Sequence, residues 1–156
     1  ESLKAALCVQ RLNACLPNVA WCEVTDMLFK NNAKIGAKYF PDKLGALEAG
    51  AAADVIVMAT PVYFYSMNGQ LKTLIDRTVP RYEEIRGKDF YYIVAAADDN
   101  RDNMRRTIEG FRAFADDCLE GSREKGIVYG VGAWQAGDIK SSPAMQEAYE
   151  MGRGVK

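Results

Sequence analysis

Hydrophobic residues along the chain fall into two kinds of segment. Short runs of β-branched, aromatic or small apolar residues are typical of strands that are covered on both faces of a parallel sheet. The segments between them are longer, and their apolar residues recur every three or four positions, as on one face of a helix. The expected strands are Val19–Val24, Val55–Thr60, Asp89–Ala97 and Gly126–Ala133.

Each gap between these strands is long enough for one crossover helix. The strand starts follow one another at intervals of about 36 residues, and a strand–helix–strand unit needs roughly 30. This alternation predicts an α/β fold with a parallel sheet, formed by residues 1–156 as a single domain. Helices are expected over residues 5–16, 41–50, 70–77 and 104–118, and from an N-cap at Ser142 and Pro143 onward.

The chain opens on a helical pattern rather than on a strand. Extrapolating the spacing backwards places a further strand about 15 residues before Glu1. In a doubly wound sheet of order 2-1-3-4-5, the first strand is the central one. We therefore expect either that the domain is incomplete at its N-terminus, or that something else fills this position.

Composition narrows the function more by exclusion than by pointing to a reaction. The 156 residues are 49% hydrophobic and 26% charged, as in an ordinary globular protein. The net charge of −1 argues against binding nucleic acid or a membrane through bulk charge. There is no histidine, which excludes a Ser–His–Asp triad, a Cys–His dyad and histidine-ligated metal sites. With neither a signal peptide nor a membrane-length apolar run, a cytoplasmic location is expected.

The four cysteines show no spacing that favours a metal or redox site. None of them forms a C-x-x-C pair, so a zinc ribbon, a thioredoxin-type motif and a ferredoxin-type cluster are unsupported. All four lie on apolar stripes or in an expected strand, and we interpret them as small buried hydrophobic residues. They are Cys8, Cys15, Cys22 and Cys118.

Ligands of open α/β sheets bind at the carboxyl ends of the strands. Three segments follow the later strands: Thr60–Gly69, Ala97–Asp102 and Gly132–Asp138. The first is unusual because a proline is followed, one residue later, by three consecutive aromatic residues at positions 63–65. Exposed aromatic residues of this kind either cover a planar ring system or pack on neighbouring loops or on a dimer partner. Both interpretations remain open from the residues alone.

Three further patterns have simpler structural interpretations. The spacing of Gly130, Gly132 and Gly137 does not fit a dinucleotide-binding loop, so we expect turn glycines. The acidic and amide residues at 98–102 are explained by helix capping, and no metal site is expected. The arginines at 101, 105 and 106 form either a solvated helix face or a contact for the 2′-phosphate of NADPH.

The segment Ala53–Arg77, ADVIVMATPVYFYSMNGQLKTLIDR, closely resembles the flavin-loop signature of flavodoxin-like NAD(P)H-dependent FMN reductases. This family includes the flavodoxin-family proteins related to iron–sulfur flavoproteins. The stretches RTIEGFRAF and GVGAWQAGDIKSSPAMQEAYEMG are similar as well. The resemblance implies a flavodoxin-like three-layer sandwich that binds FMN. It also implies NAD(P)H as reductant and a quinone, free flavin or other small molecule as acceptor.

The resemblance also implies where the cofactor binds. Backbone N–H groups of the first loop would hydrogen-bond the polar edge of the flavin and tune its potential, and no catalytic side chain is expected because the flavin carries the chemistry. The segment Ser66–Asn68 would begin the next helix, and Trp134 would cover the flavin or the site of a dimer neighbour. The implied cofactor-binding residues are Thr60, Pro61, Val62, Tyr63, Phe64, Tyr65 and Ser66, then Ala97 and Asp98, and finally Trp134.

Two departures from the family pattern change what we expect. Family members usually open with a strand and a Gly-Ser-Pro-Arg loop that binds the FMN phosphate at a helix N-terminus. Here ESLKAAL resembles the start of that helix, so the phosphate loop would lie upstream of Glu1, and we expect these 156 residues to bind FMN poorly or not at all. The segment Leu28–Gly50 has no cysteine where the iron–sulfur members carry a cluster, so no iron–sulfur cluster is expected.

Two alternative functions remain beside an FMN-dependent oxidoreductase. An electron-transfer flavodoxin is the first, although such proteins are typically strongly acidic and this chain is nearly neutral. A non-catalytic binding module that lacks the phosphate loop is the second. Whichever function applies, the apolar surface of the aromatic loop and of Trp134 favours a homodimer.

Overall fold

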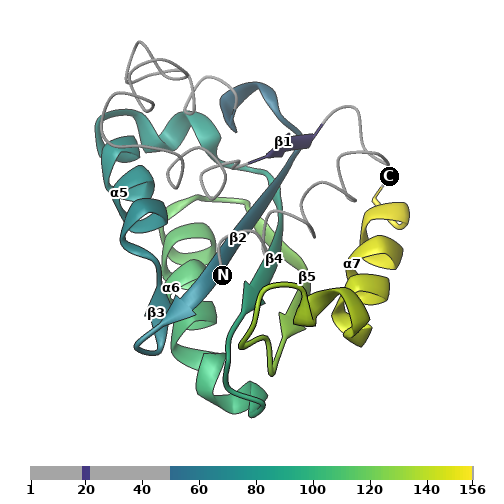
Figure 1. Ribbon diagram of the computed structural model, residues 1–156. Coiled ribbons are helices and arrows are strands. Elements are labelled where there is room, and N and C mark those ends of the chain that lie inside the picture. The colour runs from purple at the N-terminus through teal and green to yellow at the C-terminus, as the bar shows by residue number, and fades with distance from the viewer. Residues whose placement is uncertain (1–18, 22–49, 156) are drawn as a thin grey trace, which may run out of the picture.

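A computed structural model describes residues 19–21 and 50–155 of the protein (Figure 1). The expected helix over 5–16 lies outside the described residues, as does the expected helix over 41–50 apart from Gly50. The strands are β1 (Val19–Trp21), β2 (Val55–Tyr63), β3 (Ser66–Met67), β4 (Asp89–Ala95) and β5 (Arg123–Gly130). The α-helices are α5 (Gly69–Thr78), α6 (Arg105–Cys118) and α7 (Pro143–Arg153), and the 3₁₀ helices are η1 (Val79–Ile85), η2 (Arg101–Met104) and η3 (Asp138–Ser141).

The main strands form one parallel sheet in the order β1-β2-β4-β5. The short strand β3 adds an antiparallel pairing to the end of β2. The α/β fold with a parallel sheet, predicted from the apolar runs, is thereby confirmed. Val19 pairs directly with Val55, so β1 occupies the place beside β2 where the strand spacing predicted an additional central strand.

The sheet lies between two helical layers, which gives a three-layer sandwich (Figure 1). One face packs against α7 through Val55, Val57, Ile93 and Val128 on the sheet and Ala144, Met145 and Ala148 on the helix. The other face packs against α5 and α6 through Phe90, Tyr92 and Val94 on the sheet and Leu71, Ile108 and Phe111 on the helices. Burial of each large apolar side chain stabilises the fold by roughly 1.5–3 kcal/mol.

Capping side chains begin two of the helices, and the second of these caps, Ser142, was predicted from the sequence. Asn68 precedes α5, and its side-chain oxygen accepts a hydrogen bond of 2.9 Å from the Leu71 N–H. Ser142 precedes α7 in the same way, and its hydroxyl oxygen accepts a hydrogen bond of 3.2 Å from the Ala144 N–H. Pro143 occupies the first helical position. Both helices therefore begin as predicted to within one residue. None of the helices in the described part of the chain is both long and apolar enough to span a membrane.

The expectation that Cys118 is buried is wrong. The buried stripe of α6 runs through Ile108, Phe111 and Ala115 and continues to Leu119, which is fully buried. Cys118 lies one position off this stripe, is exposed, and donates a hydrogen bond to the Ala113 carbonyl at 3.1 Å. Leucine takes the inward position because it removes more apolar surface from water than cysteine does. The other three cysteines lie outside the described residues.

Candidate functional site

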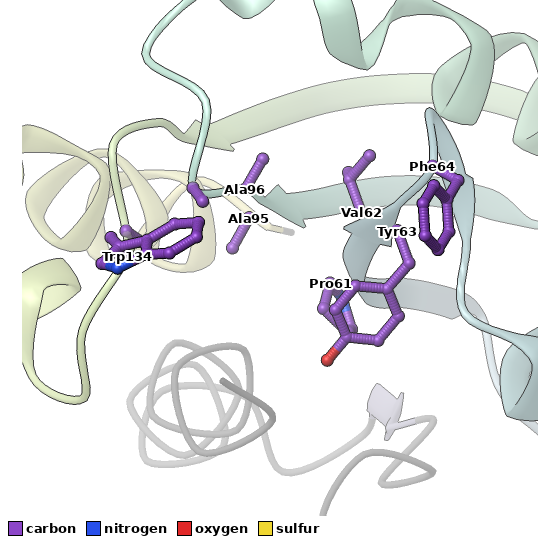
Figure 2. A pocket seen from close by; sticks show the side chains of 9 residues that line it. Pro61, Val62, Tyr63, Phe64, Ala95, Ala96 and Trp134 are labelled. Atoms are coloured by element: carbon purple, nitrogen blue, oxygen red, sulfur yellow. The ribbon is translucent and has the colours of Figure 1, made fainter.

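A pocket of about 280 Å³ opens at the carboxyl ends of β2 and β4, beside the loop that follows β5 (Figure 2). This is the edge of the sheet at which ligands of parallel α/β folds bind. Its lining consists of apolar and aromatic residues, together with the phenol of a tyrosine. The lining residues are Pro61, Val62, Tyr63, Phe64, Ala95, Ala96, Ala97, Ala133 and Trp134.

Aromatic side chains stand on opposite sides of this pocket. Figure 2 shows Trp134 on one side and Pro61 and Tyr63 on the other, with Ala95 at the strand end between them. Because alanine has only a methyl group, the strand end leaves space between the aromatic walls. A slot of this shape suits a flat, largely apolar ring system. Trp134 is 67% exposed and Phe64 is 100% exposed, so both rings are available to a ligand.

The wall on the β2 side is a tight hairpin with an unusual turn. Tyr63 pairs with Ser66, which leaves Phe64 and Tyr65 as a two-residue connection. Their φ angles are 49° and 65°, so both have the left-handed conformation that a type I′ turn requires. Asparagine and glycine normally occupy these positions, and bulky residues there are outliers. The turn is therefore strained, and its two aromatic side chains project from it.

Buried threonine and asparagine side chains hold the base of this hairpin. The Thr60 hydroxyl donates to the Pro61 carbonyl at 2.9 Å and accepts from the Asn68 N–H at 3.0 Å. Thr60 is fully buried and Asn68 is 2% exposed, so these bonds are shielded from water. They join the start of the loop to its end across eight residues. Thr60 thus holds the loop rather than lining the pocket.

The opposite side of the pocket is joined by main-chain hydrogen bonds between the loops after β4 and β5. The Ala96 N–H donates to the Gly130 carbonyl at 2.9 Å, and the Ala133 N–H donates to the Ala96 carbonyl at 2.8 Å. The Gly132 N–H donates to the Asp98 carbonyl at 2.9 Å. The φ angle of Gly132 is 65°, which glycine adopts without strain. These bonds fix the position of the loop that carries Trp134.

The carboxylate of Asp98 caps its own turn and does not line the pocket. It accepts hydrogen bonds from the Asn100 N–H at 2.8 Å and from the Asn103 side-chain amide at 2.7 Å. These two bonds lower the pKa of Asp98 below its ordinary value because they stabilise the ionised form. The capping role expected for this segment is confirmed. Among the described residues, no three acidic or cysteine side chains are grouped so that they could hold a metal ion.

The arginines near this loop make surface contacts. The Arg101 guanidinium lies 4.0 Å from the centre of the Tyr129 ring, and the Arg106 guanidinium lies 5.8 Å from that of Tyr65. Arg105 pairs with Glu109 at 3.6 Å. Arg106 is thus close to the aromatic hairpin, within the range of a cation–π contact.

The structure brings together most of the residues that the sequence predicted for the site. Tyr65 lies on the hairpin turn and Ser66 on β3, neither of them in the lining. The expectation that Ser66 and Met67 begin the next helix is wrong, because they form β3 and the helix starts at Gly69. The predicted residues in the lining are Pro61, Val62, Tyr63, Phe64, Ala97 and Trp134, and Ala95, Ala96 and Ala133 were missed.

Comparisons with known proteins agree with this fold and with the flavin-loop resemblance. A model of the family described as "NADPH-dependent FMN reductase" matches residues 9–108, more than half of the chain. The Trp repressor binding protein from Bacillus subtilis is a similar solved structure, 24% identical, with a TM-score of 0.64 over 75% of this chain and 80% of that chain. No curated protein matches the chain.

Two further solved structures share the fold at lower identity. An NADPH-quinone reductase from P. pentosaceus is 15% identical, with a TM-score of 0.60 over 74% of this chain and 76% of that chain. An NAD(P)H:quinone oxidoreductase from Methanothermobacter marburgensis is also 15% identical, with a TM-score of 0.59 over 96% of this chain and 88% of that chain.

Proposed function

Since the chain belongs to the NADPH-dependent FMN reductase family, a family of oxidoreductases, we propose that it binds FMN in the pocket between Tyr63 and Trp134. When bound, FMN would supply the redox chemistry, the transfer of electrons from NAD(P)H to an acceptor. The acceptor we propose is a quinone, free flavin or another small molecule. The observation that carries this proposal is an apolar slot with aromatic walls at the carboxyl end of a parallel sheet.

The lining fits the ring of a flavin better than it fits the phosphate. Aromatic and alanine side chains can contact a planar ring over a large area without leaving a charge unpaired. None of the described lining residues carries a charge. The described part of the pocket therefore offers the phosphate no ionic partner, and we expect recognition there to depend on the ring.

Each part of the pocket has a distinct role in this proposal. Tyr63 and Phe64 would hold the ring from the β2 side, Trp134 would hold it from the side of the β5 loop, and Ala97 would leave room for it. Thr60 keeps the loop closed, so that its main-chain N–H groups can face the polar edge of the flavin. The exposure of Phe64 and Trp134 leaves the slot open for nicotinamide and acceptor to enter in turn. Alternate entry of two substrates predicts ping-pong kinetics.

A homodimer is part of the same proposal. Phe64, Tyr65 and Trp134 are large apolar side chains that lie exposed near one pocket. Exposed apolar groups that gather in this way often mark an interface. Light scattering coupled to size-exclusion chromatography would measure the mass, and a monomer at micromolar concentration would contradict this part.

The test is a titration of the chain with FMN and with riboflavin, followed by flavin fluorescence. We expect both flavins to bind with similar affinity because the described lining contacts the ring and offers no charge to the phosphate. Trp134→Ala should lower the affinity for each flavin about tenfold, as expected for the loss of an aromatic contact that contributes about 1.4 kcal/mol. Val79→Ala is the matched control, because Val79 is 66% exposed and lies outside the pocket lining.

The outcomes separate the possible functions. NADPH oxidation that requires both flavin and a quinone supports the reductase. Flavin that binds but is not reduced by NADPH would instead favour an electron-transfer protein. Absence of binding by either flavin would contradict the proposal and favour a non-catalytic module.

A further inference from the structure

Thr107 is a buried polar residue that sequence reasoning gave no role. It lies in the first turn of α6 and is fully buried. Its hydroxyl donates a hydrogen bond of 3.2 Å to the carbonyl of Tyr65, which is 42 residues earlier in the chain. This bond links a rigid helix to the turn of the aromatic hairpin.

Two neighbouring positions of α6 also contact the hairpin. The methyl carbon of Met67 lies 3.1 Å from the place where a Cβ on Gly110 would be, so the helix has no side chain where β3 approaches it. The Arg106 guanidinium lies over the ring of Tyr65 at 5.8 Å. Residues 106, 107 and 110 lie close together on one side of a helix. This side of α6 therefore supports the hairpin.

The hairpin needs such support because of its geometry. Its paired segments contain only two residues on each side, and isolated hairpins of this kind are marginal in water. Left-handed φ angles at Phe64 and Tyr65 add strain that persists only where surrounding contacts enforce it. Thr60 and Asn68 hold the base of the loop, whereas Thr107 holds the turn itself.

We propose that Thr107 is a positioning residue for flavin binding. Its hydroxyl fixes the carbonyl of Tyr65, which keeps the strained turn in place and thereby keeps Tyr63 and Phe64 in position as one wall of the pocket. The role in flavin binding rests on the proposed function, whereas the effect on the hairpin does not. The two parts can therefore fail separately.

The first test needs no flavin. Chymotrypsin cleaves after aromatic residues, and Phe64 and Tyr65 are exposed in the turn of the single chain. The digestion is run at nanomolar protein, so that the proposed homodimer does not cover these bonds. Mass spectrometry would follow cleavage at these two bonds in the wild type, Thr107→Val, Thr107→Ser and Thr78→Val. Thr78 is the matched control because it is a buried threonine whose hydroxyl bonds within its own segment, to the Ile75 carbonyl at 2.7 Å.

We expect chymotrypsin to cleave Thr107→Val at these bonds about fivefold faster than the wild type, as for the loss of one hydrogen bond. Thr107→Ser keeps the hydroxyl and should behave as the wild type, as should Thr78→Val. Equal cleavage of Thr107→Val and the wild type would overturn the proposal, and so would fast cleavage of Thr107→Ser. Thr107→Ala, compared with Thr107→Ser, answers the same question if the valine variant does not fold.

The second test measures riboflavin and FMN affinity of the same four proteins. The dissociation constant should rise about fivefold for Thr107→Val, and Thr107→Ser should restore it. Faster cleavage with unchanged flavin affinity would refute the positioning role while leaving the hairpin contact intact. Failure of the wild type to bind either flavin would refute the proposed function, and the cleavage result would still decide whether Thr107 holds the turn.

Discussion

Phe64 offers a direct test of whether the pocket wall is strained. It is fully exposed, so replacing it removes no buried contact of the folded chain. Its φ of 49° is left-handed, a conformation that costs roughly 1–2 kcal/mol for most L-residues. Asparagine adopts this conformation more readily and is favoured in type I′ turns. Phe64→Asn should therefore raise the free energy of unfolding by about 1 kcal/mol.

This change is large enough to measure. For a protein of this size, about 1 kcal/mol raises the melting temperature by roughly 2–4 °C. Urea unfolding followed by circular dichroism would give the same free energy independently. The variant should also bind riboflavin about fivefold more weakly, since an aromatic contact contributes about 1 kcal/mol. Stability and flavin affinity would thus change in opposite directions.

Phe64→Ala separates the ring from the backbone. It removes the aromatic side chain but retains a Cβ in the left-handed region, so its free energy of unfolding should stay within about 0.5 kcal/mol of the wild type. Its riboflavin affinity should fall as much as that of Phe64→Asn. The reasoning would be refuted if Phe64→Asn were no more stable than Phe64→Ala, because strain at this residue would then be negligible.

Four further substitutions test other parts of the structure. Ala97→Leu should weaken riboflavin binding at least about tenfold by filling the slot, with fluorescence titration as the measurement. Gly130→Ala should lower the free energy of unfolding by about 1–3 kcal/mol, because its Cβ would lie 2.6 Å from Ile139. Gly69→Ala, with no atom within 4 Å of its Cβ, should not lower it. Asp98 has a lowered pKa, so its ionised form stabilises the fold above about pH 4, and this contribution is lost as the pH falls through the folded-state pKa. Asp98→Asn should accordingly lower the urea midpoint at pH 7 and lower it less at pH 3.

The central strands could be predicted from sequence because their apolar residues are consecutive. Val55 and Asp89 begin β2 and β4 as expected, since strands with neighbours on both sides are apolar throughout. By contrast, β5 begins at Arg123 rather than at Gly126, because it is the last of the described strands in the sheet order and its first residues alternate between exposed and half-buried. Arg123 pairs with Asp89 across the sheet at 2.9 Å. Because its first residues are charged, the hydrophobic pattern did not show where this strand begins.

The hairpin illustrates why the end of β2 was harder to predict. Pro61 suggested that the strand ends at Thr60, yet β2 continues to Tyr63 and turns back through β3. A two-residue hairpin is usually recognised by Asn-Gly, and here Phe64 and Tyr65 occupy those positions. The local sequence thus disfavours this turn. Contacts with residues distant in the sequence, such as Thr107, hold it in place.

The candidate site was predictable where it depends on chemistry and not where it depends on shape. Aromatic residues after a strand are conspicuous in a sequence, and Tyr63 and Phe64 were identified on that basis, whereas Trp134 was assigned through the family resemblance. Ala95 and Ala133 contribute by being small, and an alanine at a strand end carries no such signal. The run of three alanines that starts at the last residue of β4 was the only available indication.

The hairpin has a strained turn, buried threonines that hold it and exposed aromatic rings. Together these features favour a binding role over a purely structural one. A turn selected for stability would carry asparagine and glycine at positions 64 and 65 and would need no external support. Here bulky rings occupy left-handed positions, one of them fully exposed, while the fully buried Thr60 and Thr107 hold the loop at its base and its turn. Burying polar groups to maintain an exposed aromatic surface gives the isolated domain no advantage in stability. The arrangement is explained if that surface contacts a ligand, because strained backbone is then retained for binding at the wall of the proposed flavin pocket.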